Sequence, residues 1–160
     1  MTTPLLVFGW GNASRGDDAL GPMFIERLRA MVGDDGVEFQ EDYQLQVEHA
    51  LDLTGRERVL FVDASMTCAA PFEVTILQPA RDATFSTHAM SPEAVMQVFV
   101  DLHHIEPPEC TLLAIRGDAF ELGASPSASA TANLEPALEW GVRWVRGDHS
   151  RAIPDSAIRY

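Results

Sequence analysis

The sequence predicts an α/β fold: a three-layer sandwich in which a twisted, mostly parallel sheet of about five strands carries helices on both faces. Two observations lead to this prediction. Short, uninterrupted apolar runs alternate with longer segments whose apolar residues recur at helical spacing. The chain has 160 residues, 46% of them hydrophobic, which is enough for one sizeable core but too little for two ordinary domains. We therefore expect one domain over 1–147 and a polar C-terminal tail over 148–160.

The first strand and the first helix are predicted near the N-terminus. Residues 5–8 are all apolar and end at Gly9, a pattern typical of a buried central strand. A glycine-containing loop follows. One apolar face then begins at helical spacing, and Gly33 provides a stop signal. That face consists of Leu20, Phe24, Leu28, Met31 and Val32.

Three strands and a brief helix are predicted next. A short strand near 37–40 leads into a polar loop and a brief helix around 47–53. Residues 59–62 are apolar without interruption and run directly into Asp63, so that a charge lies where the strand should end. A strand over 72–77 alternates and is bounded by prolines, which favours a position near a sheet edge, where antiparallel pairing could occur.

The second half of the chain predicts two more helices and one strand. Ser91 and Pro92 are typical of a helix N-cap and first residue, and Pro107 and Pro108 would end that helix. A strand follows over 111–115, and a loop over 117–132 precedes the final helix. The predicted inner faces are Val95, Val98, Phe99, Leu102 and Ile105 in the first helix, and Leu134, Leu138, Val142 and Val145 in the second.

Charge and composition exclude several classes of protein. The formal net charge of -13 argues against binding to nucleic acid or to an anionic membrane surface. Two cysteines without a CxxC pair predict neither a disulfide framework nor a zinc-thiolate site. The first ten residues lack the features of a signal peptide, and no apolar run is long enough to span a membrane. We therefore expect a cytoplasmic protein.

An acidic loop between the first strand and the first helix is the first candidate site. It has the position of a dinucleotide-binding loop, but Ser14 stands where such a loop needs glycine. Asp17 and Asp18 would also repel a pyrophosphate, so a cation is the more natural ligand. The alternative is purely structural: Asp17 caps the helix and Asp18 interacts favourably with its dipole.

Asp63 is the second candidate, because ligands of such sheets collect beyond the carboxyl ends of the strands. The acidic loop would emerge at the same edge. A charge this close to a core is costly unless it is partnered or reached by water. The alternative is a carboxylate that caps a neighbouring loop.

His88 is the third candidate, in a loop ahead of the helix that Ser91 caps. A neutral imidazole there could bind a metal or move a proton, although a loop histidine can equally be a surface group. The same alternative applies to His49, His103, His104 and His149. Ser14 and Ser65 lack a nucleophile elbow, and Cys68 lacks a cysteine-protease signature. Two carboxylates and an imidazole would suit a borderline divalent ion such as nickel, zinc or iron.

These residues form part of an ordered set of motifs that resembles the nickel-iron hydrogenase maturation endopeptidases. The set spans nearly the whole chain. In order, it comprises Gly11-Asn12, Asp17-Asp18 with Gly21-Pro22, Gln44-Leu45 with Glu48, Val62-Asp63-Ala64, Thr87-His88 with Met90-Ser91, and Gly117 with Leu122-Gly123. The segment 44–48 looks more like the branch that serves cytoplasmic, cofactor-linked hydrogenases than the membrane-bound uptake type. The Ala/Ser-rich run over 125–132 departs from a tight family motif.

The resemblance implies an enzyme that removes a C-terminal extension from the precursor of a hydrogenase large subunit after nickel insertion. By similarity, Asp18, Asp63 and His88 would contact nickel, and Asp18 or Asp63 would serve catalysis. The nickel would be supplied by the substrate, with no permanent cofactor. Asp17 is adjacent but does not match a ligand of the family. The expected partner is the precursor, and the expected state is a monomer.

Two other functions would use the same residues. A nickel-sensing chaperone would dock the precursor without cutting it. A free-standing metal-dependent hydrolase would instead bind metal tightly by itself and turn over small substrates without a protein partner.

Overall fold

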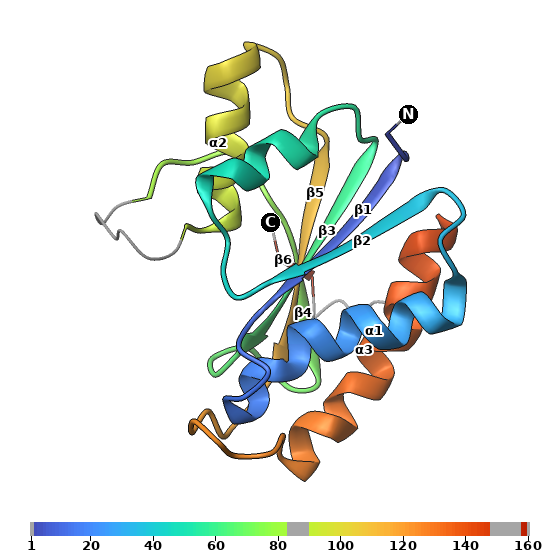
Figure 1. Cartoon of the computed structure of the whole chain (residues 1–160), viewed down its shortest axis with the longest axis vertical. Helices are drawn as coiled ribbons and strands as arrows, with labels where there is room; N and C mark the ends of the chain where they lie inside the picture. The colour runs from blue at the N-terminus through green and yellow to red at the C-terminus, as the bar shows by residue number, and fades with distance from the viewer. Residues whose placement is uncertain (1, 83–89, 148–157, 160) are drawn as a thin grey trace.

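A computed structural model of the chain describes residues 2–82, 90–147 and 158–159. Its centre is a twisted sheet with the strand order β2-β1-β3-β5-β4-β6 (Figure 1). The strands are β1 (Leu5–Trp10), β2 (Val37–Asp42), β3 (Arg58–Ser65), β4 (Phe72–Ile76), β5 (Glu109–Arg116) and the two-residue β6 (Ile158–Arg159). Four neighbouring strands, β2, β1, β3 and β5, run parallel, whereas β4 pairs antiparallel with β5. The predicted mostly parallel α/β sheet is thus confirmed.

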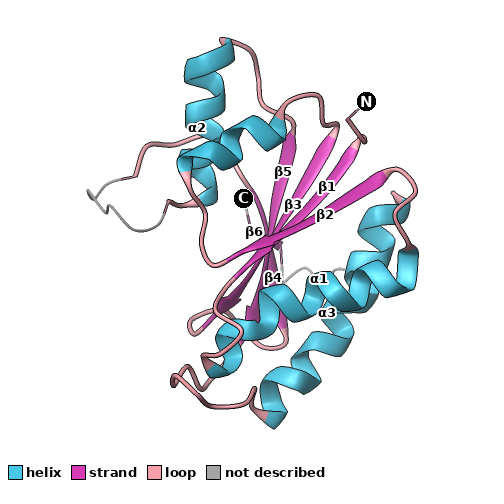
Figure 2. Cartoon of the chain, in the orientation of Figure 1, coloured by secondary structure: helices cyan, strands magenta, loops and turns pink. Residues whose placement is uncertain are grey.

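Helices cover both faces of the sheet (Figure 2). On one face, α1 (Leu20–Val32) and α3 (Ala128–Arg146) enclose one hydrophobic cluster with the sheet. On the other, α2 (Pro92–His103) and the short 3-10 helix η2 (Val47–Leu53) enclose a second cluster. A further 3-10 turn, η1 (Gly16–Ala19), leads directly into α1. No helix in the described part of the chain is long and apolar enough to cross a bilayer.

The ends of α1 and α2 follow the predicted signals in part. Gly33 ends α1 with a φ of 75°, a conformation that glycine adopts without strain. The Ser91 hydroxyl accepts the N–H of Ala94 at 3.1 Å, so the predicted N-cap of α2 is confirmed. The helix ends earlier than predicted, however, because His104 takes the left-handed conformation and its N–H bonds to the carbonyl of Val100.

Three side chains assigned to inner helix faces lie elsewhere. Leu102 is 57% exposed, and Ile105 lies beyond the end of α2 and is exposed as well. Met31, in the last turn of α1, is also exposed. Periodicity placed these residues on the apolar stripes, but Met31 and Leu102 lie in the last turns of their helices and Ile105 lies beyond α2, and all three are exposed.

The last helix begins earlier than predicted. Residues 117–132 were expected to be loop throughout, but α3 starts at Ala128 because Ser127 caps it by accepting the N–H of Ala130. Leu134 and Leu138 are buried as predicted, whereas Val142 and Val145 are only partly buried. Trp140 and Trp144 fill the interface instead.

The described part of the C-terminal segment is the short strand β6. Ile158 and Arg159 pair with Val74 and Thr75 of β4. The boundary between a domain over 1–147 and a tail over 148–160 stays a prediction.

Candidate active site

The acidic loop places Asp18 at the carboxyl edge of the sheet. The chain leaves β1, turns through Gly11 and Asn12, and enters η1, where the Asp18 carboxylate accepts the N–H of Asn12 at 2.7 Å. Gly11 has a φ of 147°, and a Cβ built there would lie 2.0 Å from the Asp18 carbonyl oxygen. Only glycine permits this close approach, so the Gly-Asn pair positions the acid that follows it.

Asp63 lies near the end of β3, between β1 and β5. Sequence reasoning placed it just after the strand, but β3 continues to Ser65 and Asp63 pairs in register with Ala114. The extra length follows from the neighbouring strand, because β5 runs to Arg116 and supplies partners that local sequence does not reveal. The side chain is therefore largely, but not completely, withdrawn from water.

The two acids are close enough to interact. Burial raises the pKa of Asp63 to about 7, the negative charge of Asp18 adds to this increase, and a hydrogen bond from the Ala64 N–H opposes it. The structure thus brings together two of the three predicted site residues from separate elements. A cation between them, or a proton on Asp63, would relieve the repulsion.

The third predicted residue, His88, lies outside the described residues. Among the residues that are described, no group of three His, Cys, Asp or Glu side chains is arranged to hold a metal ion. The assignment of Asp18, Asp63 and His88 as a nickel-contacting set therefore stays a prediction. What the described residues contribute is a pair of carboxylates.

Asp17 has a different role from its neighbour. Its side chain is completely buried and does not cap α1, so the predicted helix-capping role is wrong. It accepts four hydrogen bonds from the loop between β5 and α3, donated by the N–H groups of Asp118, Ala119 and Ser127 and by the Ser127 hydroxyl. Burial alone would raise the pKa of Asp17, but these bonds together lower it. Asp17 is thus a buried anion with its own set of donors.

A small cleft adjoins the acidic loop. Its volume is about 290 Å³, and it is lined by Gly11, Ala13, Pro22, Glu41, Asp42 and Tyr43.

His49, which lies close to Asp42, has a structural role. Its Nδ1 accepts the N–H of Gln46 at 2.8 Å and its Nε2 lies 3.3 Å from the Asp42 carboxylate.

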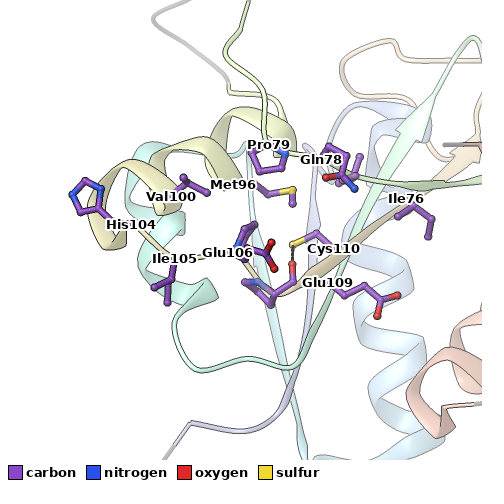
Figure 3. Close-up of a pocket in the computed structure, with 13 residues that line it drawn as sticks. Ile76, Gln78, Pro79, Met96, Val100, His104, Ile105, Glu106, Glu109 and Cys110 are labelled. Atoms are coloured by element: carbon purple, nitrogen blue, oxygen red, sulfur yellow. Dashed lines mark hydrogen bonds between the residues drawn. The ribbon is translucent and has the colours of Figure 1, made fainter.

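A larger cavity of about 830 Å³ lies at the opposite edge of the sheet, between the end of α2 and the beginning of β5 (Figure 3). Its walls are mainly apolar, with Met96 and Ile105 among them. Cys110 also lines it, but burial raises the pKa of this thiol to about 12, which leaves it protonated at neutral pH. Neither Asp18 nor Asp63 lines this cavity, so the carboxyl edge remains the candidate active site.

Comparison with known proteins gives one full-length relative. No protein-family model matches the sequence. The chain is 28% identical over 162 residues to the Hydrogenase 2 maturation protease of Escherichia coli strain K12, and the match covers 96% of this chain and 98% of that protein.

Solved structures share the fold. The NiFe hydrogenase maturation protease HycI from Thermococcus kodakarensis KOD1 superposes with a TM-score of 0.69 at 23% identity, covering 90% of this chain and 93% of that one. The hydrogenase maturating endopeptidase HybD from E. coli superposes with a TM-score of 0.69 at 24% identity, covering 95% and 98%. The full-length relative, the ordered motifs and the fold agree: over nearly its whole length, the chain is similar to hydrogenase maturation proteases.

Proposed function

We propose that this chain is the endopeptidase that removes the C-terminal extension from the large-subunit precursor of a nickel-iron hydrogenase after nickel has been inserted. The observation that carries the proposal is the interacting pair of Asp18 and Asp63 at the carboxyl edge of the sheet. Two carboxylates held together repel one another, and a divalent cation brought by the substrate would relieve that repulsion. The enzyme would thereby distinguish a precursor that carries nickel from one that does not.

His88 completes the proposed set as a third ligand. Two oxygen ligands and one imidazole suit a borderline ion such as nickel. Nickel would remain held by the substrate, and the chain would have no permanent cofactor. The -13 net charge supports a role without nucleic acid or a membrane surface as partner. We further propose a cytoplasmic monomer that serves the branch of cytoplasmic, cofactor-linked hydrogenases.

Asp18 and Asp63 would also catalyse the hydrolysis of the peptide bond, as in an aspartyl-type endopeptidase. One carboxylate, of Asp18 or Asp63, takes a proton from water while the water oxygen bonds to the scissile carbonyl carbon. The same carboxyl group then returns the proton to the leaving amide nitrogen as the C–N bond breaks. Substrate nickel would either polarise the carbonyl as a Lewis acid or anchor the chain beside the acids.

Mass spectrometry of processed precursor tests the proposal. The purified chain is incubated with a nickel-loaded and a nickel-free precursor, and the products are weighed. Trimming of the loaded form alone is expected. Asp18→Asn should abolish trimming, whereas Asp35→Asn, which alters an exposed carboxylate on the surface, should not.

Other outcomes identify the alternatives. Association of the precursor without any trimming would replace the protease with a nickel-sensing chaperone. Equal trimming of both precursors would overturn nickel recognition while leaving the endopeptidase activity in place. Tight binding of free nickel by the isolated chain, with turnover of small substrates, would instead identify a free-standing hydrolase.

A further inference from the structure

Three segments that are distant in sequence meet beside the candidate active site. The first is the turn that carries Asp18, the second is the end of β3, and the third is the loop from Gly117 to Ser127. The Gly117 N–H bonds to the carbonyl of Ser65 at 2.9 Å, two residues beyond Asp63. The loop that meets the Asp18 turn is thus also attached to the strand that carries Asp63.

Asp17 lies buried at the centre of this junction. Its Oδ2 accepts the N–H groups of Asp118 at 2.8 Å and Ala119 at 2.9 Å and the hydroxyl of Ser127 at 2.7 Å, while its Oδ1 accepts the Ser127 N–H at 2.6 Å. A carboxylate withdrawn from water is costly unless such donors satisfy it. Both oxygens are therefore held, and the side chain has little freedom to rotate.

Backbone contacts strengthen the same junction. The Asp17 N–H donates to the Ala119 carbonyl at 2.7 Å, the Gly16 N–H to the Ala124 carbonyl at 3.0 Å, and the Gly123 N–H to the Ser14 carbonyl at 2.6 Å. A Cβ on Gly117 would lie 2.8 Å from the Asp17 Cβ, and one on Gly16 would lie 2.3 Å from the Ala119 oxygen. The turn and the loop are packed too closely to slide past each other.

We propose that Asp17 is a positioning residue that holds the Asp18 carboxylate at its working distance from Asp63, by fastening the turn of Asp18 to the loop that Gly117 anchors on β3. This proposal rests on the proposed function for its effect on cleavage. The adjoining acids therefore have different roles: Asp17 is bonded to the loop, and the Asp18 carboxylate remains at the site, where it accepts the Asn12 N–H.

A purely stabilising role makes a different prediction. If Asp17 only stabilised the fold, its replacement would lower the melting temperature, but the molecules that stay folded would keep Asp18 in place and cut at the normal rate. The Asn12 amide reports on this directly, because its N–H donates to the Asp18 carboxylate at 2.7 Å. Loss of that bond would move the amide proton resonance upfield, and the measurement needs no substrate.

The test uses Asp17→Asn in the full chain. Asparagine has nearly the same shape, but its NH₂ group would face backbone donors. We expect an upfield shift of the Asn12 amide proton and a fall of roughly 10- to 100-fold in kcat/KM on the nickel-loaded precursor, the cost typical of a small misplacement of a catalytic group. A folded variant with an unchanged Asn12 resonance and unchanged kcat/KM would overturn the proposal.

If Asp17→Asn does not fold, variants of Ser127 test the same proposal. Ser127→Ala removes one donor to Asp17, together with the N-cap of α3, and is expected to shift the Asn12 resonance in the same direction. Ser127→Thr retains the hydroxyl for both bonds and should leave the resonance at its wild-type position. Thr131→Ala is the matched control, because the Thr131 hydroxyl donates to the Ser127 carbonyl at the same helix start and is not among the described donors to Asp17. Equal effects of Ser127→Ala and Thr131→Ala would overturn the proposal.

Failure of the proposed function would look different. If the wild-type chain left every precursor intact, the endopeptidase assignment would fall. The Asn12 resonance in the Asp17 and Ser127 variants would still decide whether Asp17 holds Asp18.

Discussion

The carboxylate of Asp18 interacts with that of Asp63 across the carboxyl edge of the sheet, and this interaction adds to the effect of burial in raising the pKa of Asp63 to about 7. One acid comes from a turn after β1 and the other from the end of β3. Parallel strands direct their carboxyl ends to one edge, so the fold itself brings the two together.

Removing the charge of Asp18 should lower the pKa of Asp63. In Asp18→Asn, the electrostatic repulsion is lost while burial, the larger cause, remains. The pKa of Asp63 should therefore fall but stay above the ordinary value of 3.8. A ¹³C NMR titration of the side-chain carboxyl carbons measures it. An unchanged pKa would show that the two groups do not interact.

Asp63 should make the free chain less stable as the pH rises. Its pKa in the folded state, about 7, lies above the ordinary value of 3.8, so the folded chain keeps a proton that the unfolded chain loses. The free energy of unfolding should therefore fall between about pH 4 and pH 7, by at most about 1.4 kcal/mol per pH unit, and then level off.

Urea denaturation at a series of pH values measures this effect. In Asp63→Asn the fall assigned to Asp63 should disappear, so the variant should gain most in stability over wild type above pH 7. Asp35→Asn, at an exposed position, is the control. A difference between Asp63→Asn and wild type that is the same at pH 4 and pH 8 would contradict the assignment.

Gly11→Ala should displace Asp18. The new methyl group would meet the Asp18 carbonyl oxygen, and the positive φ adds backbone strain of about 1–3 kcal/mol. Gly36→Ala is a matched control, since Gly36 also has a positive φ but nothing lies within 4 Å of its added Cβ. Both variants should lose stability in thermal denaturation, but only Gly11→Ala should lose cleavage of the precursor.

Cleavage should depend on ionic strength. A chain with a net charge of -13 attracts a basic surface or tail on the precursor, and salt screens that attraction. We expect kcat/KM to fall as salt is added while kcat changes little, because encounter is affected more than chemistry. Initial rates between low and high salt measure this, with a neutral osmolyte as control. A rate independent of salt would remove electrostatic steering.

Local patterns predicted the two acids, because a charge that follows an apolar run and an acidic turn before a helix are both visible in sequence. They could not predict what Asp17 does. Its partners, Asp118, Ala119 and Ser127, lie more than a hundred residues away, and three of its four bonds come from backbone N–H groups that have no sequence signature. Only the folded chain brings that loop to the turn.

The helices, too, have some features that local sequence predicts and others that depend on tertiary contacts. Ser91 was visible as an N-cap because a proline follows it, whereas Ser127 lies in an Ala/Ser-rich run that looks like loop. Trp140 and Trp144 are buried because the sheet and α1 provide an apolar surface for them, which the periodicity of α3 alone does not show. Local sequence therefore predicts the elements and the acids, and tertiary contacts determine how they are held.

X-ray absorption at the nickel edge shows whether Asp18 and Asp63 bind nickel that is held by the precursor. Spectra are recorded from the nickel-loaded precursor alone and from its rapidly frozen mixtures with the wild-type chain and with Asp18→Asn. We expect additional oxygen or nitrogen ligands on nickel with the wild-type chain and fewer with the variant. A nickel spectrum that is unchanged when the wild-type chain binds would contradict it.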